Sequence, residues 1–377
     1  MYRNHYNIGN INKILIMSIK MHARHIYPVA LCWALLSPIR AVESAPAEIP
    51  LIAVDAYATT ALWAHVFVDY FIPEVDRRLA ETGNYQVRWN KAFGGTIAKT
   101  GGVLDSLKHD LADIGIITTP YHPDKVPFHN LPYVTPLVSS DLGLVARTMS
   151  SLVDKYPVLK DRWLDHKLVF LTTAGSIDSY QVFTNYPIET LDDFRGRKIA
   201  GVGLNLRLLS GVGATPVSSG ISDWYNNLAT GLVDGLIGWT EGSIAYRLYE
   251  VAPYMVDARL GAVPTKSIAV NERAWTRLPE EVRNILLEAA ADYRDELARE
   301  TDRRAAASRL RYQQEGGQII ALTDEQRRQW AMGLPNIAQD WARDMEARGL
   351  PGSEILQDYM NIMREHDQPI MRHWDRE

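Results

Sequence analysis

The sequence of 377 residues predicts an α/β fold of two lobes, in which parallel-type sheets carry helices on both faces. Strand patterns alternate with helical patterns over residues 50–117, and such alternation is typical of parallel sheets. A second alternation occupies residues 191–239. The roughly 330 residues that follow residue 44 are enough to form two lobes with sizeable cores.

The first alternation opens with a buried strand and an amphipathic helix. Residues 50–57 (PLIAVDAY) form an apolar run, and residues 61–80 repeat apolar side chains at helical spacing. Pro73 inside that helix predicts a kink or a restart, because proline lacks the N–H that an α-helix uses. The elements that follow are a strand at 85–90, a helix at 101–111, a strand at 113–117, a mainly helical segment at 141–165 and a strand at 167–172.

The second alternation predicts the other lobe. We expect the chain to cross between the lobes near residues 173–176 and to return with a strand at 267–271. Ser222 and Asp223 are suitable caps for the second of the two helices expected there. The predicted elements between the crossings are strands at 181–184, 197–201 and 232–237 and helices at 205–211 and 222–230.

Residues 279–314 carry the longest helical pattern of the chain. Pro279 stands at its start, acidic residues occupy its first turn, and two glycines follow its end. At 1.5 Å per residue this helix extends about 50 Å, which is longer than one lobe is wide. A short strand at 318–322 precedes the capping box Thr323–Gln326. The rest of the chain is rich in Trp, Arg and Met at helical spacing, and we expect it to pack as helices on the outside.

The N-terminus has the pattern of an export signal. Arg24 and His25 precede an apolar run at 26–36, and Val42 and Ser44 fit the −3 and −1 positions of a cleavage site near Ser44. The alternative is an N-terminal helix that the mature protein keeps. The run is 11 residues long, whereas a membrane span needs roughly 20, so we expect no permanent span.

Cysteine and charge narrow the class of protein further. The single cysteine, Cys32, lies inside the predicted signal, and Leu31 before it argues against a lipoprotein. Residues 1–44 hold five basic residues and one acidic residue, so without them the net charge changes from −5 to −9. An acidic surface repels phosphate backbones and disfavours nucleic-acid binding.

Common catalytic and cofactor motifs are missing from the sequence. The segment GVGLNL lacks the third glycine of a dinucleotide fingerprint, and no GxxxxGK[ST], HExxH or GxSxG pattern occurs. The histidines form no i, i+4 pair of the kind that ligates zinc. We therefore expect no cofactor and no metal.

Five segments together resemble a known family. They are FIPEVDRRLAETG, FGGTIAKTGGVLDSLKHDLADIGII, FTNYPIETLDDFRGRKIAGVG, VGATPV and TGLVDG, in this order between residues 50 and 314. The chain thereby resembles the DctP family, the periplasmic solute-binding proteins of the tripartite ATP-independent periplasmic (TRAP) transporters. The resemblance implies a two-lobe periplasmic binding protein fold whose long helix runs along both lobes.

The resemblance also implies a function. Such a protein captures a small organic acid in the periplasm, catalyses nothing, and delivers the acid to membrane permease subunits. The alternatives are an enzyme with the same cleft, in which Glu241 or Asp178 stands beside a hydroxyl, and a sensor subunit. The expected organisation is a signal at 1–44, the first part of lobe 1 at 45–173, lobe 2 at 174–264, a return to lobe 1 with the long helix at 265–322, and C-terminal helices at 323–377.

One departure bears on the ligand. Most family members place an arginine after Lys-Ile on the strand before the glycine turn, where it grips the ligand carboxylate, but here the third residue is Ala200. A second basic position of the family corresponds to Tyr180. The usual carboxylate clamp is thus in doubt, and a C4-dicarboxylate or sialic acid is not assumed. Aromatic and keto acids remain open, and the many rings favour an aromatic or hydrophobic carboxylate.

The candidate binding residues lie in loops and first turns after predicted strands, where open parallel sheets bind ligands. Backbone N–H groups at the helix start near Asn205 attract anions, and Arg207 either reaches the same place or points to solvent. The loop at 94–96 is a second candidate or a simple turn, and some of the aromatic residues belong to the core if the alternative holds. The predicted substrate-binding residues are Trp63, Phe93, Gly95, Thr96, Tyr121, Tyr180, Asn205, Arg207, Trp239 and Thr240.

Overall fold

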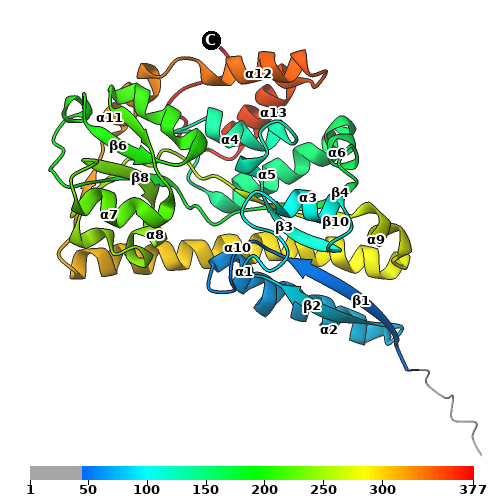
Figure 1. Cartoon of the computed structure of the whole chain (residues 1–377). Coiled ribbons are helices and arrows are strands. Elements are labelled where there is room, and N and C mark those ends of the chain that lie inside the picture. Colours follow the sequence, from blue (N-terminus) through cyan, green and yellow to red (C-terminus); the bar gives the residue numbers. More distant parts are fainter. Residues whose placement is uncertain (1–44) are drawn as a thin grey trace, which may run out of the picture. The chain divides into compact units, whose positions relative to one another are not determined.

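The computed structural model describes residues 45–377, which contain two β-sheets (Figure 1). The predicted export signal and Cys32 lie outside the described residues. Each sheet is the centre of one lobe, and helices cover both of its faces. The predicted α/β class is confirmed, although both sheets are mixed and not purely parallel.

The first sheet has the strand order β2-β1-β3-β10-β4. Strand β1 pairs in parallel with β2 and β3, whereas β10 runs antiparallel to β3 and β4 because the chain enters it on returning from the second lobe. Lys266, the first residue of β10, therefore lies opposite Thr118 and Ala174, the last residues of β3 and β4. The bounds are β1 Ala47–Val54, β2 Tyr85–Ala92, β3 Ile114–Thr118, β4 Leu168–Ala174 and β10 Lys266–Asn271.

The first helical segment confirms the irregularity predicted at Pro73. It is α-helical in α1 (Leu62–Val66), π-helical in η1 (Phe67–Phe71) and α-helical again in α2 (Ile72–Thr82). The missing N–H of Pro73 leaves an earlier carbonyl without its α-helical donor, and the π-turn accommodates this. The other helices of this lobe are α3 Val103–Lys108, α4 Leu131–Val134, α5 Leu142–Lys155, α6 Pro157–Leu164 and α9 Glu272–Arg277.

The second sheet has the order β11-β9-β5-β8-β6-β7. Strand β5 runs antiparallel to β8 and β9. Strand β9 was not predicted, and β8 begins three residues later than expected. Strand β11 pairs with β9, so the end of the expected return to lobe 1 instead belongs to the second sheet. The bounds are β5 Tyr180–Thr184, β6 Lys198–Gly201, β7 Thr215–Ser218, β8 Gly235–Trp239, β9 Tyr254–Asp257 and β11 Gln318–Ala321.

Short helices join the strands of the second lobe. The segment predicted as a helix at 205–211 is a 3₁₀ helix, η5 (Gly203–Val212). The predicted cap at Asp223 accepts no capping hydrogen bond from helix α7. The remaining bounds are η4 Leu191–Phe194, η6 Ile221–Asp223, α7 Trp224–Ala229, α8 Thr240–Ala245 and η7 Leu248–Glu250.

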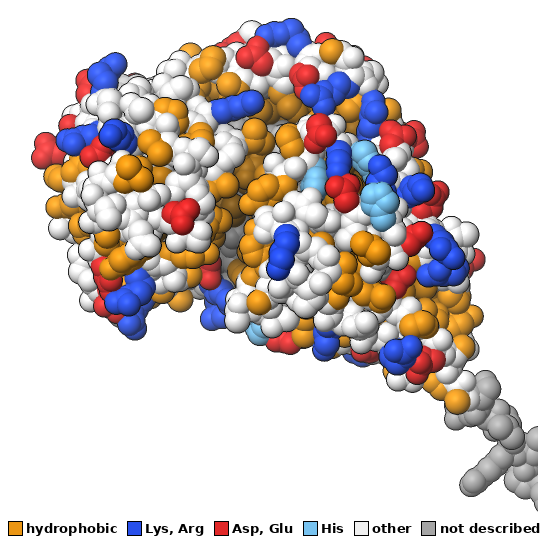
Figure 2. Space-filling view, viewed as in Figure 1, with side chains coloured by type: hydrophobic (Ala, Val, Ile, Leu, Met, Phe, Trp, Pro, Cys, Tyr) orange, Lys and Arg blue, Asp and Glu red, His pale blue; other side chains and the backbone are white. Residues whose placement is uncertain are grey.

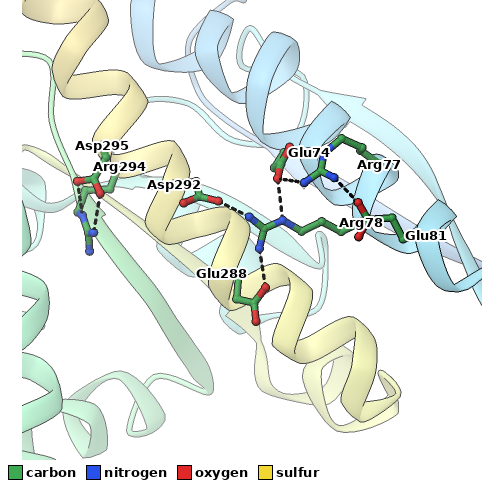
Figure 3. Close-up of polar contacts among 8 residues, drawn as sticks. All are labelled: Glu74, Arg77, Arg78, Glu81, Glu288, Asp292, Arg294 and Asp295. Carbon is green, nitrogen blue, oxygen red and sulfur yellow. Dashed lines mark hydrogen bonds and ion pairs between the residues drawn. The ribbon is translucent and has the colours of Figure 1, made fainter.

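The long helix α10 (Glu280–Gln314) runs along both lobes (Figure 1), as predicted. On the first lobe, Arg78 of α2 donates to Glu74 of its own helix at 2.7 Å, to Glu288 of α10 at 2.5 Å, and to Asp292 of α10 (Figure 3). Arg77 bonds only to Glu74 and Glu81 of its own helix. Arg78 is therefore the residue of this network that fastens α2 to α10.

The C-terminal helices are more deeply packed than expected. They are α11 (Asp324–Gly333), α12 (Ile337–Ala347) and α13 (Gly352–Glu365), and the predicted capping box at Thr323 is confirmed. Trp330 of α11 is fully buried and donates to the carbonyl of Leu208 in the second lobe at 2.7 Å. Helix α12 packs on α4 and α13 on α5, both in the first lobe. These helices do not merely cover the outside, because their tryptophans complete a core shared by both lobes.

Within residues 45–377 the chain passes between the lobes four times. The first two passages, at 175–179 and 258–265, run side by side and hydrogen-bond to each other, for example from the Val263 N–H to the Ile177 carbonyl. The third lies inside α10 and the fourth between α11 and α12. We call the first two passages the hinge segments.

Candidate functional site

A hollow separates the two lobes (Figure 2), and its visible walls carry mostly hydrophobic and uncharged side chains. The ends of β1, β3 and β4 and the start of β10 meet at one edge of the first sheet. The start of β5 and the ends of β6 and β8 meet at one edge of the second sheet. Both hinge segments leave from these edges, which are therefore the edges that border the gap between the lobes.

A lysine lies at the edge of the first sheet inside a cage of polar and aromatic groups. Lys266 Nζ lies 3.1 Å from Thr118 Oγ1, 3.9 Å from the centre of the Trp63 ring and 5.4 Å from that of Tyr57. Asp55 follows β1 and accepts the Trp63 indole N–H at 2.8 Å and the Tyr57 backbone N–H at 3.2 Å. We call Lys266 with Asp55, Tyr57, Trp63 and Thr118 the Lys266 cage.

Burial shifts the pKa values of Asp55 and Lys266, the two charged groups of the cage, in opposite directions. It raises the pKa of Asp55 to about 6, although the positive charge of Lys266 acts against this rise. It lowers the pKa of Lys266 to about 8, and Asp55 opposes that change. For both groups the effect of lost hydration on the pKa is larger than the effect of their mutual attraction, because each charge is buried and the two do not touch.

A group of tyrosines connects the two edges. The hydroxyls of Tyr133 in α4 and Tyr180 at the start of β5 are 3.0 Å apart. Burial raises the pKa of Tyr180 to about 12, whereas hydrogen bonds from Tyr133 and Asn205 lower it. Burial and the neighbouring Tyr121 raise the pKa of Tyr57. Tyr121, which is 43% exposed, thus lies between the Lys266 cage and the tyrosines of the second edge.

The glycine turn after β6 offers no cation to this group. Ala200 is fully buried, and Arg207 is exposed on η5. Asn205 accepts the Val202 N–H at 2.9 Å through Oδ1, which fixes the turn. A Cβ at Gly201 would lie 2.6 Å from both Asn205 Oδ1 and Ile237 Cγ2, so the turn requires glycine there.

The structure places the predicted site residues in three settings. Trp63, Tyr121, Tyr180 and Asn205 belong to the Lys266 cage or to the tyrosine group. Gly95 and Thr96 lie in the loop after β2, where the Gly95 N–H already donates to the Asp55 carbonyl at 3.4 Å.

The side chains of the remaining predicted residues have other partners, although Trp239 lies opposite Tyr180 in the pairing of β8 with β5. Phe93 packs edge-on against Phe67 in the core of the first lobe. Trp239 packs against Trp224 of α7 and donates to Glu241 at 3.2 Å. Arg207 is exposed on η5, and Thr240 donates a hydrogen bond to Asp178 of the first hinge segment.

A polar cavity of about 300 Å³ lies between the hinge segments and α10. Thr240 donates to Asp178 Oδ2 at 2.9 Å, and Asp178 Oδ1 has no partner among the described residues. Burial raises the pKa of Asp178 to about 6. The charged residues that line this cavity come from the second lobe, the hinge segments and α10: Asp178, Asp257, Arg259, Asp302 and Arg309.

Sequence reasoning missed Asp55, Tyr57, Tyr133 and Lys266. Asp55 and Tyr57 had a usable signal, because they stand at the end of the strand predicted at 50–57. Lys266 directly precedes the strand predicted at 267–271, and its sequence neighbours do not distinguish it from an ordinary solvent-exposed lysine. Lys266 is buried because β10 pairs between β3 and β4, and this position in the sheet cannot be predicted from the local sequence.

Among residues 45–377, no helix combines the length and hydropathy that crossing a membrane requires. The same residues contain no cluster of three His, Cys, Asp or Glu side chains arranged to hold a metal ion.

Fold and site together define a two-lobed solute-binding protein, and comparison with known proteins gives the family. The model of the bacterial extracellular solute-binding protein family 7, DctP, matches residues 76–344. The chain belongs to this family and is a solute receptor of the TRAP transporter type. The family is one of receptors and not of enzymes.

Individual relatives agree with this assignment. A solute-binding protein of Albidiferax ferrireducens is 24% identical over 267 residues, which cover 69% of this chain and 75% of the relative. A TRAP periplasmic solute-binding protein from Desulfovibrio salexigens, solved as an open complex, superimposes with a TM-score of 0.74 at 22% identity, covering 85% of this chain and 97% of that one. A TRAP solute-binding protein from Rhodoferax ferrireducens, in complex with copurified benzoate, gives a TM-score of 0.70 at 17% identity over 85% and 98%.

Proposed function

We propose that this receptor takes a small organic acid between its lobes in the periplasm and delivers it unchanged to the membrane permease of a TRAP transporter. The observation that carries the proposal is the meeting of both lobes at one polar and aromatic group. Tyr180 of the second sheet bonds to Tyr133 of the first lobe, and Tyr121 connects this pair to the Lys266 cage. A molecule held there contacts both lobes at once.

Contact with both lobes is what a closing receptor needs. A ligand shifts the balance between open and closed forms only if it binds the closed form better. The hinge segments are short and lie side by side, so a small rotation there moves whole lobes. An organic acid suits the group because hydroxyls, rings and one buried ammonium surround it. The benzoate complex of the Rhodoferax ferrireducens relative supports the same ligand class.

A thermal-shift experiment tests the proposal. The purified protein is heated with aromatic, keto and dicarboxylic acids, each at several concentrations, and with sodium chloride at matched ionic strength as the control. A cognate acid at hundred-fold excess over its Kd adds about 2.7 kcal/mol to the free energy of unfolding, which raises Tm by some degrees. If no acid of any class raised Tm above the salt control, the proposed ligand class would be wrong.

The same samples distinguish a receptor from an enzyme. A receptor returns its ligand intact, so mass spectrometry after hours of incubation should recover the acid unaltered and in full. Conversion of the acid by the protein, absent from a heat-denatured control, would instead support catalysis near Asp178 and Thr240, where a carboxylate and a hydroxyl already meet.

A further inference from the structure

The Lys266 ammonium is a buried charge without an ion-pair partner among the described residues. The Lys266 residue is 4% exposed, and no carboxylate oxygen of residues 45–377 lies within 4.0 Å of Nζ. Thr118 supplies one hydrogen-bond acceptor, and the Trp63 ring supplies a cation–π contact. Buried charges are normally paired, so this arrangement is incomplete as it stands.

Asp55 does not complete it. Both carboxylate oxygens of Asp55 already accept hydrogen bonds, from the Trp63 indole and the Tyr57 backbone. The cage thus holds its lysine near a carboxylate but beyond contact. An incoming anion that touches Nζ gains the full attraction, because water has already been excluded from the ammonium.

The place of Lys266 also fits an anion that the second lobe does not grip. On that lobe Ala200 near the end of β6 is buried and uncharged, and Arg207 of η5 is exposed. Lys266 lies across the gap, at the edge of the first sheet that borders the hollow. The cation at this site therefore belongs to the first lobe and not to the second.

We propose that Lys266 binds the carboxylate of the ligand and that the ligand is a monocarboxylate with a flat ring. This inference rests on the proposed receptor function and specifies its ligand. The ring lies against the aromatic faces of Tyr57, Trp63 and Tyr121. A second carboxylate is disfavoured, because Asp55 repels it and the other groups of the cage and tyrosine group are uncharged.

Charge-matched probes test the role of Lys266. Benzoate and benzamide have the same ring and nearly the same shape, but only benzoate is charged. Calorimetry on the wild-type protein should show tighter binding of benzoate. Lys266→Met replaces the ammonium-bearing chain by an unbranched, uncharged chain one atom shorter, and it should weaken benzoate binding by at least about 30-fold while benzamide binding changes little.

Lys160→Met is the matched control. Lys160 is an exposed lysine of α6 that pairs with Asp154 at 2.8 Å, and its loss should change benzoate affinity by less than about threefold, as for other solvent-screened charges. Equal weakening by both variants would overturn the assignment to Lys266. So would a Lys266→Met protein that keeps its benzoate affinity, and in either case the receptor function would stand.

The ligand class has its own outcomes. Binding of succinate or phthalate more tightly than benzoate would overturn the monocarboxylate class but leave the receptor function intact. Binding of no acid by the wild-type protein would remove the proposed function itself, and this inference with it.

A second measurement uses only the wild-type protein and therefore tests the inference even if Lys266→Met does not fold. Wild-type affinity for benzoate should fall between pH 7 and pH 9.5, as the ammonium loses its proton, while benzamide affinity stays level. Asp55, Tyr57 and Tyr121 are the titratable groups that face the site, and the pKa values of Asp55 and Tyr57 lie outside this range. A benzoate affinity as flat as that of benzamide would contradict the inference.

Discussion

At the scale of single residues, burial has separated the two charges of the Lys266 cage from water without joining them. Most buried ion pairs offset their loss of hydration by direct contact. Here each group has other partners, and the pKa shift of each favours its neutral form. The Lys266 ammonium can therefore still attract an anion, and its burial without a contacting anion costs folding free energy.

This cost predicts a pH dependence of stability. The pKa of Lys266 is lowered from 10.5 to about 8, so between these values the unfolded chain keeps a proton that the folded one has lost. Stability contributed by this residue therefore rises from pH 8 to pH 10.5. Urea unfolding should show the wild type gaining about 2–3 kcal/mol relative to Lys266→Met across this window. Parallel curves for the two proteins would contradict the shift.

At the scale of elements, Arg78 is the arginine of α2 that reaches helix α10, where Thr82 and Asn84 also hydrogen-bond to Glu281. Arg78 reaches Glu288 and Asp292 on α10 and is 20% exposed, whereas Arg77 stays on its own helix and is 54% exposed. Arg77 first and Arg78 second lower the pKa of Glu74 to about 2. The ionised network is thus fully formed at neutral pH.

Arg78→Ala should lower the free energy of unfolding by about 1–2 kcal/mol at pH 7, and Arg77→Ala should lower it much less, because Arg77 is solvent-screened. The pKa of Glu74 is depressed, so its contribution is present above pH 4.5 and is lost as pH falls towards 2. The difference between Arg78→Ala and the wild type should shrink over the same window. Guanidinium chloride is unsuitable because it screens ion pairs, so urea unfolding is the measurement. Equal losses for both variants would show that the link to α10 contributes nothing.

Most elements could be predicted from periodicity, and the exceptions have physical causes. Strand β9 is four residues long and follows a turn-rich segment, so its pattern is too short to recognise. The π-turn before Pro73 was predictable as an irregularity because proline alone forces one. The depth at which the C-terminal helices pack was not predictable, since Trp330 of α11 is buried against the second lobe and Trp341 of α12 against the first, through partners distant in sequence.

At the scale of the whole molecule, the hinge segments touch closely. A Cβ added to Gly175 would lie 2.5 Å from the Pro264 Cα on the other segment. Backbone atoms cannot rotate away as side chains do. The contact therefore sets how near the two hinge segments lie.

Gly175→Ala should separate the segments and cost about 1–3 kcal/mol of stability. Gly220→Ala is the control, because its nearest atom belongs to the flexible side chain of Asp223, and it should change stability by less than about 0.5 kcal/mol. Urea unfolding measures both, and small-angle scattering with and without the acid identified by thermal shift reports whether closure survives. A Gly175→Ala protein as stable as Gly220→Ala would show that the hinge tolerates the wider spacing.

The site was less predictable than the fold, because it depends on the arrangement of the two lobes in the whole molecule. Tyr180 and Tyr121 could be placed at strand ends from the sequence, but their meeting depends on how the lobes face each other. Lys266 and Tyr133 gave no local sign of function. Phe93 and Trp239 followed strands as expected, yet their rings turn into the cores of their own lobes.

The four passages of the chain between the lobes have a consequence for durability. Secreted proteins meet proteases, and exposed connectors are where such enzymes cut. In most two-part proteins joined by one linker, a single cut releases the parts. Here three connections remain after any one of the four is severed, and one of the four is the middle of a 35-residue helix. We therefore expect a nicked molecule to stay assembled, with both halves of its binding surface in register.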